Sequence, residues 1–121
     1  MILPDTSVWI DHFRGSETAL AGLLRRDDLL LHAFVIGELA LRYLPRPSMT
    51  IARLQLQLQA PILEPDEILS FIRKHGLAGA GLGYVGVHLL ASVSLMTNAK
   101  LWTFDKRLHA TANKLAIAVY P

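Results

Sequence analysis

Short apolar runs alternate with longer segments of helical spacing along this chain. The runs have the length of strands buried on both faces, and they lie at residues 2–5, 29–33, 60–63, 100–104 and 116–120. A helical segment follows most of them, which is typical of strands joined by crossover helices. The pattern therefore predicts an α/β fold of three layers, α/β/α, with a central, mostly parallel sheet.

Residues that commonly start or stop helices bound several of the predicted helices. Pro65 and the two acids after it favour a helix start, and Pro45 ends the segment that begins at Phe34. Ser48 is a suitable N-cap for a helix that runs through Gln59, with apolar residues at 51, 54 and 58 on one stripe. The helices expected are 17–26, 34–44, 48–59, 65–75, 84–95 and 106–114, and residues 8–13 continue the first strand as an apolar segment.

Composition limits the class of protein. The chain has 121 residues, 52% of them hydrophobic, and a mean hydropathy of +0.36, which fits one domain spanning residues 1–121. No cysteine is present, so disulfides and thiolate metal sites are excluded. No apolar run reaches the roughly 18 residues of a membrane helix, and Pro4 and Asp5 interrupt any signal-peptide core. We expect a soluble cytoplasmic protein that does not contact membranes.

Charge adds little at the level of the whole chain. Lys and Arg number 12 and Asp and Glu number 10, so the net charge of +2 gives only a faint indication of a polyanionic partner. The positions of the acids say more. Asp5 and Asp105 each follow an apolar strand and precede a helix, and Glu38 lies in the first turns of the helix after the second strand. Since parallel strands end at one edge of a sheet, these three acids are predicted to meet there.

Each acid also has a plainer interpretation. Asp5 and Asp105 both stand where an N-cap or an Asx-turn is common, and for Asp105 the cap is as good an explanation as catalysis. Glu38 lies in an otherwise apolar helix, where a metal or a burial partner would explain it, although an exposed glutamate is also possible. Together the three acids favour a site for a hard divalent cation such as Mg²⁺ or Mn²⁺, which binds oxygen ligands and can activate water. Without cysteine or an HExxH motif, zinc is disfavoured.

Four motifs in order carry a resemblance to a known family. They are Asp5-Thr6-Ser7, Gly37-Glu38, the stretch from Gly83 to Ala91, and the stretch from Leu101 to Leu108. In this order and spacing the chain resembles the PIN-domain family, and more narrowly its VapC-type toxins. The resemblance implies a PIN fold, a Mg²⁺- or Mn²⁺-dependent endoribonuclease that leaves a 3′-hydroxyl and a 5′-phosphate, inhibition by a VapB-type antitoxin, and commonly a homodimer. No DNA contact is expected of the toxin itself.

Carried over by position, the resemblance makes Asp5, Glu38 and Asp105 the catalytic and metal-binding acids, with Thr6 and Thr103 at the hydroxyl positions beside them. Gly86 stands where the family has a fourth metal-binding Asp, and its glycine has no evident structural purpose. Glycine in the first turn of a helix costs up to about 1 kcal/mol relative to alanine. Either the residue was substituted to silence a toxic nuclease, or this is a natural member that lost activity or uses another ligand. His88, two residues further along the helix, is expected to pack rather than to replace the ligand.

Further features allow two interpretations or a competing function. Arg42, Arg46, Lys106 and Arg107 could hold an RNA backbone, or could be solvated charges. The glycine-rich residues 78–83 lack the GK[ST] ending of a phosphate loop and are expected to be a flexible connection. The aromatic residues expected in the core are Trp9, Phe13, Trp102 and Phe104.

A non-catalytic module that binds RNA or an antitoxin would retain the same fold. A phosphotransferase of the haloacid dehalogenase type is disfavoured, because Ser7 stands where its second acid would be. A phospho-receiver domain lacks its acceptor Asp at the end of the third strand.

Overall fold

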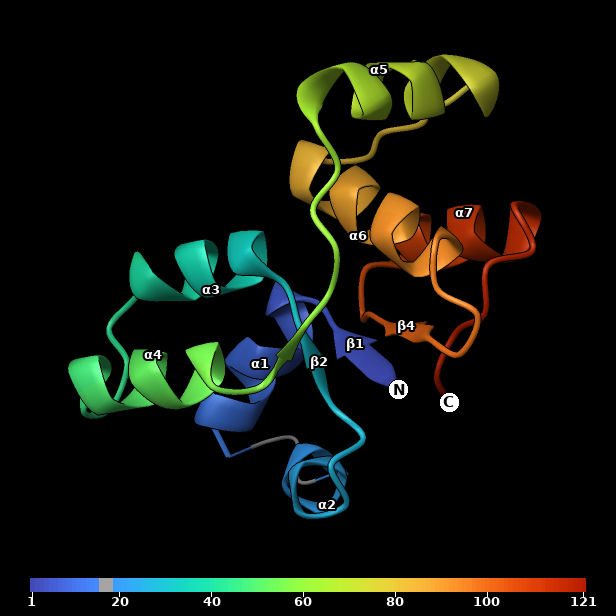
Figure 1. Ribbon diagram of the computed structural model, residues 1–121. Helices are drawn as coiled ribbons and strands as arrows, with labels where there is room; N and C mark the ends of the chain where they lie inside the picture. Colours follow the sequence, from blue (N-terminus) through green and yellow to red (C-terminus); the bar gives the residue numbers. More distant parts are fainter. Residues whose placement is uncertain (16–18) are drawn as a thin grey trace.

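The computed structural model describes residues 1–15 and 19–121, and Figure 1 shows the path of the chain. Helices pack around short strands, most of whose residues are buried. In chain order the elements are β1 (Ile2–Pro4), α1 (Thr6–Phe13), α2 (Ala19–Arg25), β2 (Leu30–Leu31), α3 (Ala33–Ala40), α4 (Pro47–Gln55), β3 (Leu58–Gln59), α5 (Pro65–Lys74), α6 (Tyr84–Ser94), β4 (Lys100–Trp102) and α7 (Lys106–Lys114).

All the strand pairings are parallel. β1 pairs with β4, with Leu3 opposite Leu101, and β2 pairs with β3. Single bridges extend the ladder, since Ile2 pairs with Leu29 and Leu101 pairs with Val119. The spatial order is therefore β3, β2, β1, β4 and the segment at Val119. This confirms the predicted parallel α/β architecture and brings the carboxyl ends of β1 and β4 to the same edge.

Fully buried leucines on the strands anchor the helices. The leucines without exposed surface are Leu3, Leu30, Leu31 and Leu101. Helix α1 packs against β1, and helix α6 packs against β4. Helix α3 packs against α1 and α4, and α5 packs on α6 further from the sheet (Figure 1). A separate apolar cluster that includes Ile68 joins α5 to α6. These contacts fix the N-terminus of α6 beside the ends of β1 and β4.

The helix predicted over 48–59 is present as α4, but its predicted end and the predicted strand after it are wrong. The helix expected over 48–59 ends at Gln55, and Leu58 and Gln59 form β3 instead; residues 60–63 are not a strand, although the Ala60 N–H still donates to the Leu31 carbonyl at 2.7 Å. Pairing with β2 outweighs the helical spacing of the apolar residues, because strand preference depends on tertiary contacts.

Other boundaries shift by a few residues. Ala33 begins α3 rather than ending a strand, and α3 ends at Ala40 rather than at Leu44. Arg46, whose φ of 46° is left-handed, stands directly before α4. Residues 8–13 belong to helix α1, β4 stops at Trp102, and the closing strand is reduced to the bridge at Val119.

The remaining helix predictions hold to within a residue or two. The predicted helix 17–26 appears as α2, and its first residues, 17 and 18, lie outside the described part. The helices predicted over 65–75, 84–95 and 106–114 are confirmed as α5, α6 and α7. Within the described residues, no helix is long and apolar enough to cross a bilayer.

Candidate active site

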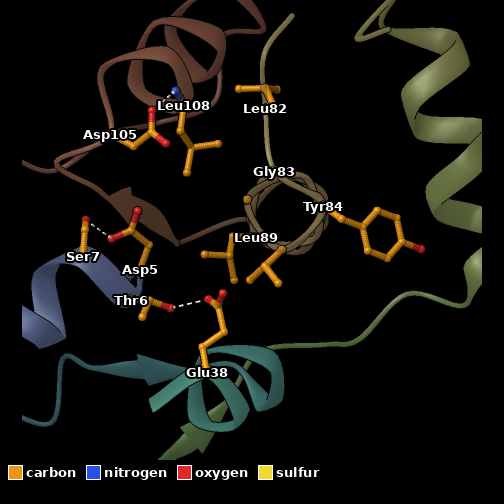
Figure 2. A pocket seen from close by; sticks show the side chains of 12 residues that line it. Asp5, Thr6, Ser7, Glu38, Leu82, Gly83, Tyr84, Leu89, Asp105 and Leu108 are labelled. Carbon is orange, nitrogen blue, oxygen red and sulfur yellow. Dashed lines mark hydrogen bonds between the residues drawn. The ribbon is translucent and has the colours of Figure 1, made fainter. Parts of the chain in front are cut away.

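Asp5, Glu38 and Asp105 line one cavity of about 340 Å³, here called the acid cavity. Asp5 follows β1, Glu38 lies on α3, and Asp105 follows β4, so segments up to 100 positions apart in the chain supply its acids. Figure 2 shows the three carboxylates around one opening, with the N-terminus of α6 forming another wall. The three acids line one cavity, as predicted from the parallel strands; that they share a metal ion, and their individual roles, stay predictions.

Asp5 is almost fully buried, with 7% of its surface exposed, and its carboxylate is held by several donors. The Val8 N–H donates to Oδ1 at 3.3 Å as the cap of α1, and the Ser7 hydroxyl donates to the same oxygen. The Thr103 hydroxyl donates to Oδ2. Burial raises the pKa of Asp5, and the hydrogen bonds from the Ser7 and Thr103 hydroxyls partly oppose that rise.

The two hydroxyls that bind Asp5 also fix the loop after β4. Thr103 Oγ1 accepts the Asp105 N–H at 3.0 Å, and Ser7 Oγ accepts the Phe104 N–H at 3.2 Å. The ends of β1 and β4 are thereby joined by side chains as well as by the ladder. Sequence reasoning gave Ser7 no role, although its position two residues after a capping Asp is typical of such a turn.

Glu38 and Asp105 are held in the acid cavity by different hydrogen-bond donors. The Thr6 hydroxyl donates to Glu38 Oε1 at 2.5 Å, which ties α3 to the residue next to Asp5 (Figure 2). Asp105 Oδ1 accepts the N–H groups of Arg107 at 2.9 Å and Leu108 at 3.1 Å, so it caps α7. For both Asp5 and Asp105 the capping interpretation and a place in the acid cavity are true together.

Gly86 lies in the first turn of α6 and lines the acid cavity. A Cβ built on Gly86 would lie 3.2 Å from Leu108 Cδ1 and 3.4 Å from Leu108 Cδ2. Leu108 is 3% exposed and fills the space beside the glycine. A side chain at position 86 would therefore require the end of the Leu108 side chain to shift by a few tenths of an ångström, and the expectation that glycine has no structural purpose stays a prediction.

The chemistry of the lining suits a hard cation. The acids offer carboxylate oxygens, and the ion pair found in the described residues joins Arg26 to Asp28, away from this cavity. No group of three acid, histidine or cysteine side chains lies close enough to hold an ion together within residues 1–15 and 19–121. Mg²⁺ usually takes one or two carboxylates and keeps several waters, so the residues fit a hydrated ion rather than one bound directly by three carboxylates.

Of the four basic residues named as possible RNA contacts, two line hollows beside the acids and two do not. Arg42 lines a shallow hollow with Thr6 and Glu38, and Lys106 lines another with Asp105. Arg107 packs on the loop of residues 78–83, where a Cβ on Gly81 would lie 3.1 Å from its Cδ atom. Arg46 is the left-handed residue that precedes α4 and lines neither of these hollows.

Most of the aromatic and histidine predictions are confirmed, and one is wrong. Trp9 and Trp102 are 4% exposed, as expected of core residues, and Phe13 packs partly buried against the core. Phe104 is 46% exposed, so its assignment to the core is wrong: β4 has ended before it. His88 is 2% exposed and packs against other rings, which confirms the packing interpretation.

Comparison with known proteins adds to this geometry. A family model described as PIN domain matches residues 2–114, a range that includes the three acids and position 86. Ribonuclease VapC32 of Mycobacterium tuberculosis, from strain CDC 1551 / Oshkosh and from strain ATCC 25618 / H37Rv, is 41% identical to this chain over 119 residues. The aligned part covers 98% of this chain and 96% of each relative.

Proposed function

The chain belongs to the PIN-domain family, as a relative of VapC-type proteins, and we propose that it is an endoribonuclease toxin of that type, impaired by glycine at position 86. The observation that carries the proposal is the meeting of Asp5, Glu38 and Asp105 in one cavity of a chain 41% identical to a ribonuclease. The reaction is attack of water on an RNA phosphodiester, with a 3′-hydroxyl and a 5′-phosphate as products.

A Mg²⁺ or Mn²⁺ ion is part of this proposal. Three carboxylates that line one cavity support it, because none of them forms an ion pair with a basic side chain in the described residues and carboxylate oxygens are the ligands that a hard cation prefers. Asp5, Glu38 and Asp105 would hold the ion or its waters. When bound, the ion would activate water and stabilise charge on the phosphoryl group.

The protein's own side chains prepare the site. Three donors hold the Asp5 carboxylate in one orientation, and the Thr6 hydroxyl does the same for Glu38. Leu89 and Leu108 line the same cavity and reduce its contact with water, which strengthens electrostatic interactions inside it. At position 86 the carboxylate that would complete the set is absent.

A VapB-type antitoxin and a second copy of the chain are the protein partners that fit this proposal. The relative's VapC name supports the antitoxin partner. Large apolar side chains exposed between residues 41 and 56 give a surface for one of these contacts: Leu41, Tyr43, Met49 and Leu56.

A non-catalytic binding module is the second candidate, and glycine at position 86 favours it, because the fourth carboxylate that the family resemblance implies is absent there. The test compares Mg²⁺-dependent cleavage of RNA by this chain and by the Gly86→Asp variant. Restoring one charge-stabilising group at an active site commonly changes the rate by about 10²- to 10³-fold, so a gain of that order is expected. Gly86→Asn is the matched control, since it has the same shape without the charge.

Two further variants make the comparison decisive. Gly86→Asp combined with Leu108→Val gives the new side chain room, because the Cβ contact with Leu108 is only 3.2 Å. Gly86→Asp combined with Asp5→Asn shows whether any gain comes from the acid cavity. Folded Gly86→Asp protein that cleaves no RNA, with or without the Leu108 change, would refute the impaired-nuclease proposal and leave the binding module.

A further inference from the structure

A second hollow adjoins the acid cavity. It has a volume of about 280 Å³ and is lined by Thr103, Phe104, Asp105, Lys106 and His109; we refer to it as the Phe104 hollow. Asp105 lines both spaces, so the two share a wall. Anything bound in the Phe104 hollow therefore lies next to the acids.

Phe104 is held at the rim of this hollow rather than in the core. Its ring is 46% exposed, whereas Trp102, two residues earlier, is 4% exposed. The Phe104 N–H donates to Ser7 Oγ at 3.2 Å, and its ring meets Trp102 edge to face with centroids 6.1 Å apart. A single exposed aromatic residue is ordinary. This one is positioned by the same hydroxyl that binds Asp5.

The cation that lines the hollow, Lys106, suits a phosphate of a polyanion. Lys106 and His109 lie on the first turns of α7 and line the hollow, beside a cavity whose three carboxylates repel phosphate. Single-stranded RNA is commonly bound by stacking of its bases on aromatic rings, with cations at its phosphates. An exposed aromatic ring and a lysine in one hollow provide both contacts.

We propose that the Phe104 hollow is a nucleotide subsite, in which a base of single-stranded RNA stacks on Phe104 and a neighbouring phosphate contacts Lys106. This inference rests on the proposed RNA substrate. It adds a binding residue outside the acid cavity, and it gives the substrate a direction of approach across Asp105.

The test measures binding of a fluorescein-labelled single-stranded RNA of mixed sequence to this chain by fluorescence anisotropy, at fixed salt. Stacking on one aromatic side chain contributes enough that Phe104→Ala and Phe104→Leu should raise the Kd by roughly 5- to 100-fold. Phe104→Trp should retain binding, since it keeps an aromatic face. Leu95→Ala is the matched control, because Leu95 is 60% exposed just beyond the far end of α6 from the acid cavity.

A second readout separates stacking from general packing. RNA that carries 2-aminopurine should lose fluorescence when it binds the parent chain and the Phe104→Trp variant, but not when it binds Phe104→Leu. Lys106→Ala should weaken binding and reduce the slope of log K against log salt by about 0.7, the value for one contact to a single strand.

The two proposals fail in different ways. If the parent chain binds RNA and Phe104→Leu binds it equally well, the subsite is overturned while the proposed nuclease stands; Phe104 would then be a contact for another protein. If neither this chain nor Gly86→Asp binds or cleaves RNA, the proposed function itself fails and the subsite with it.

Discussion

Two buried histidines should make the protein lose stability as the pH falls from 6.5 toward 4. His32 is fully buried at the start of α3, where its Nδ1 accepts the Phe34 N–H at 3.0 Å. Its ring lies 6.2 Å from that of His88, and the rings of Phe34 and Tyr84 also pack on His88. Burial, and then repulsion from His88, lower the pKa of His32 to about 4. Burial lowers the pKa of His88 too.

The size of the effect follows from linkage between protonation and folding. The His32 ring takes up a proton near pH 6.5 in the unfolded chain but only near pH 4 in the native protein. The stability that depends on neutral His32 is therefore fully present above pH 6.5 and is lost progressively as the pH falls toward 4. A pKa difference of about 2.5 corresponds to about 3 kcal/mol once the pH is below 4, and to about 2 kcal/mol at pH 5. His88 acts in the same direction. Domains commonly have only 5–15 kcal/mol in total, so the loss at pH 5 is measurable.

Urea denaturation at pH 7.5, 6.5, 5.5 and 5.0 measures this loss. His32→Asn keeps an acceptor for the cap of α3 and removes the titration, so its free energy of unfolding should depend less on pH than that of the parent. The comparison uses the slope of the free energy of unfolding against pH, because His32→Asn also loses the packing of the ring and so changes the absolute stability. His75→Asn, at the end of α5, is the control and should retain the parent slope. Equal slopes for the parent and His32→Asn would refute the reasoning.

Three further predictions concern the acid cavity. Thr103→Val should lower the free energy of unfolding by about 1–3 kcal/mol in urea, because the buried Asp5 carboxylate loses its hydroxyl donor, while Thr103→Ser should recover most of the loss. Asp5→Asn should raise the free energy of unfolding at pH 7, since the raised pKa of Asp5 means that the charged form destabilises the native state above pH 3.8; lower stability than the parent would contradict this. Arg42→Ala, on the Glu38 side of the cavity, should weaken RNA binding in anisotropy and flatten its salt dependence, whereas Arg53→Ala on α4 should leave both unchanged.

The meeting of the acids is predictable from sequence because it depends on topology more than on detail. Once the strands are taken as parallel, Asp5 and Asp105 must lie near one edge, since Asp5 directly follows β1 and Asp105 comes three positions after the end of β4. The choice between cap and ligand could not be made in the same way. A carboxylate has two oxygens, and in Asp5 one oxygen caps α1 while the other accepts a bond from Thr103, so the two interpretations were never exclusive.

The errors arise where one pattern fits two structures. Apolar residues at 51, 54 and 58 fit a helical stripe, yet Leu58 lies in β3 because Leu30 offers it a parallel partner from far along the chain. Phe104 alternates with Trp102 as in a strand, but β4 ends at Trp102 and the alternation no longer indicates burial. For Leu58 the deciding contact is remote in sequence and leaves no local signal.

The hydrogen bonds that hold Asp5 in the acid cavity do not depend on position 86. Asp5 receives its donors from Ser7, Val8 and Thr103, and none of these contacts involves α6. An acid in the first turn of α6 would gain from the helix dipole but would add a fourth negative charge to a cavity that already disfavours ionised Asp5. Glycine removes that repulsion, and Leu108 occupies the space. The hydrogen bonds that hold Asp5 do not involve position 86, so Gly86→Asp tests the proposed impairment without removing any of them.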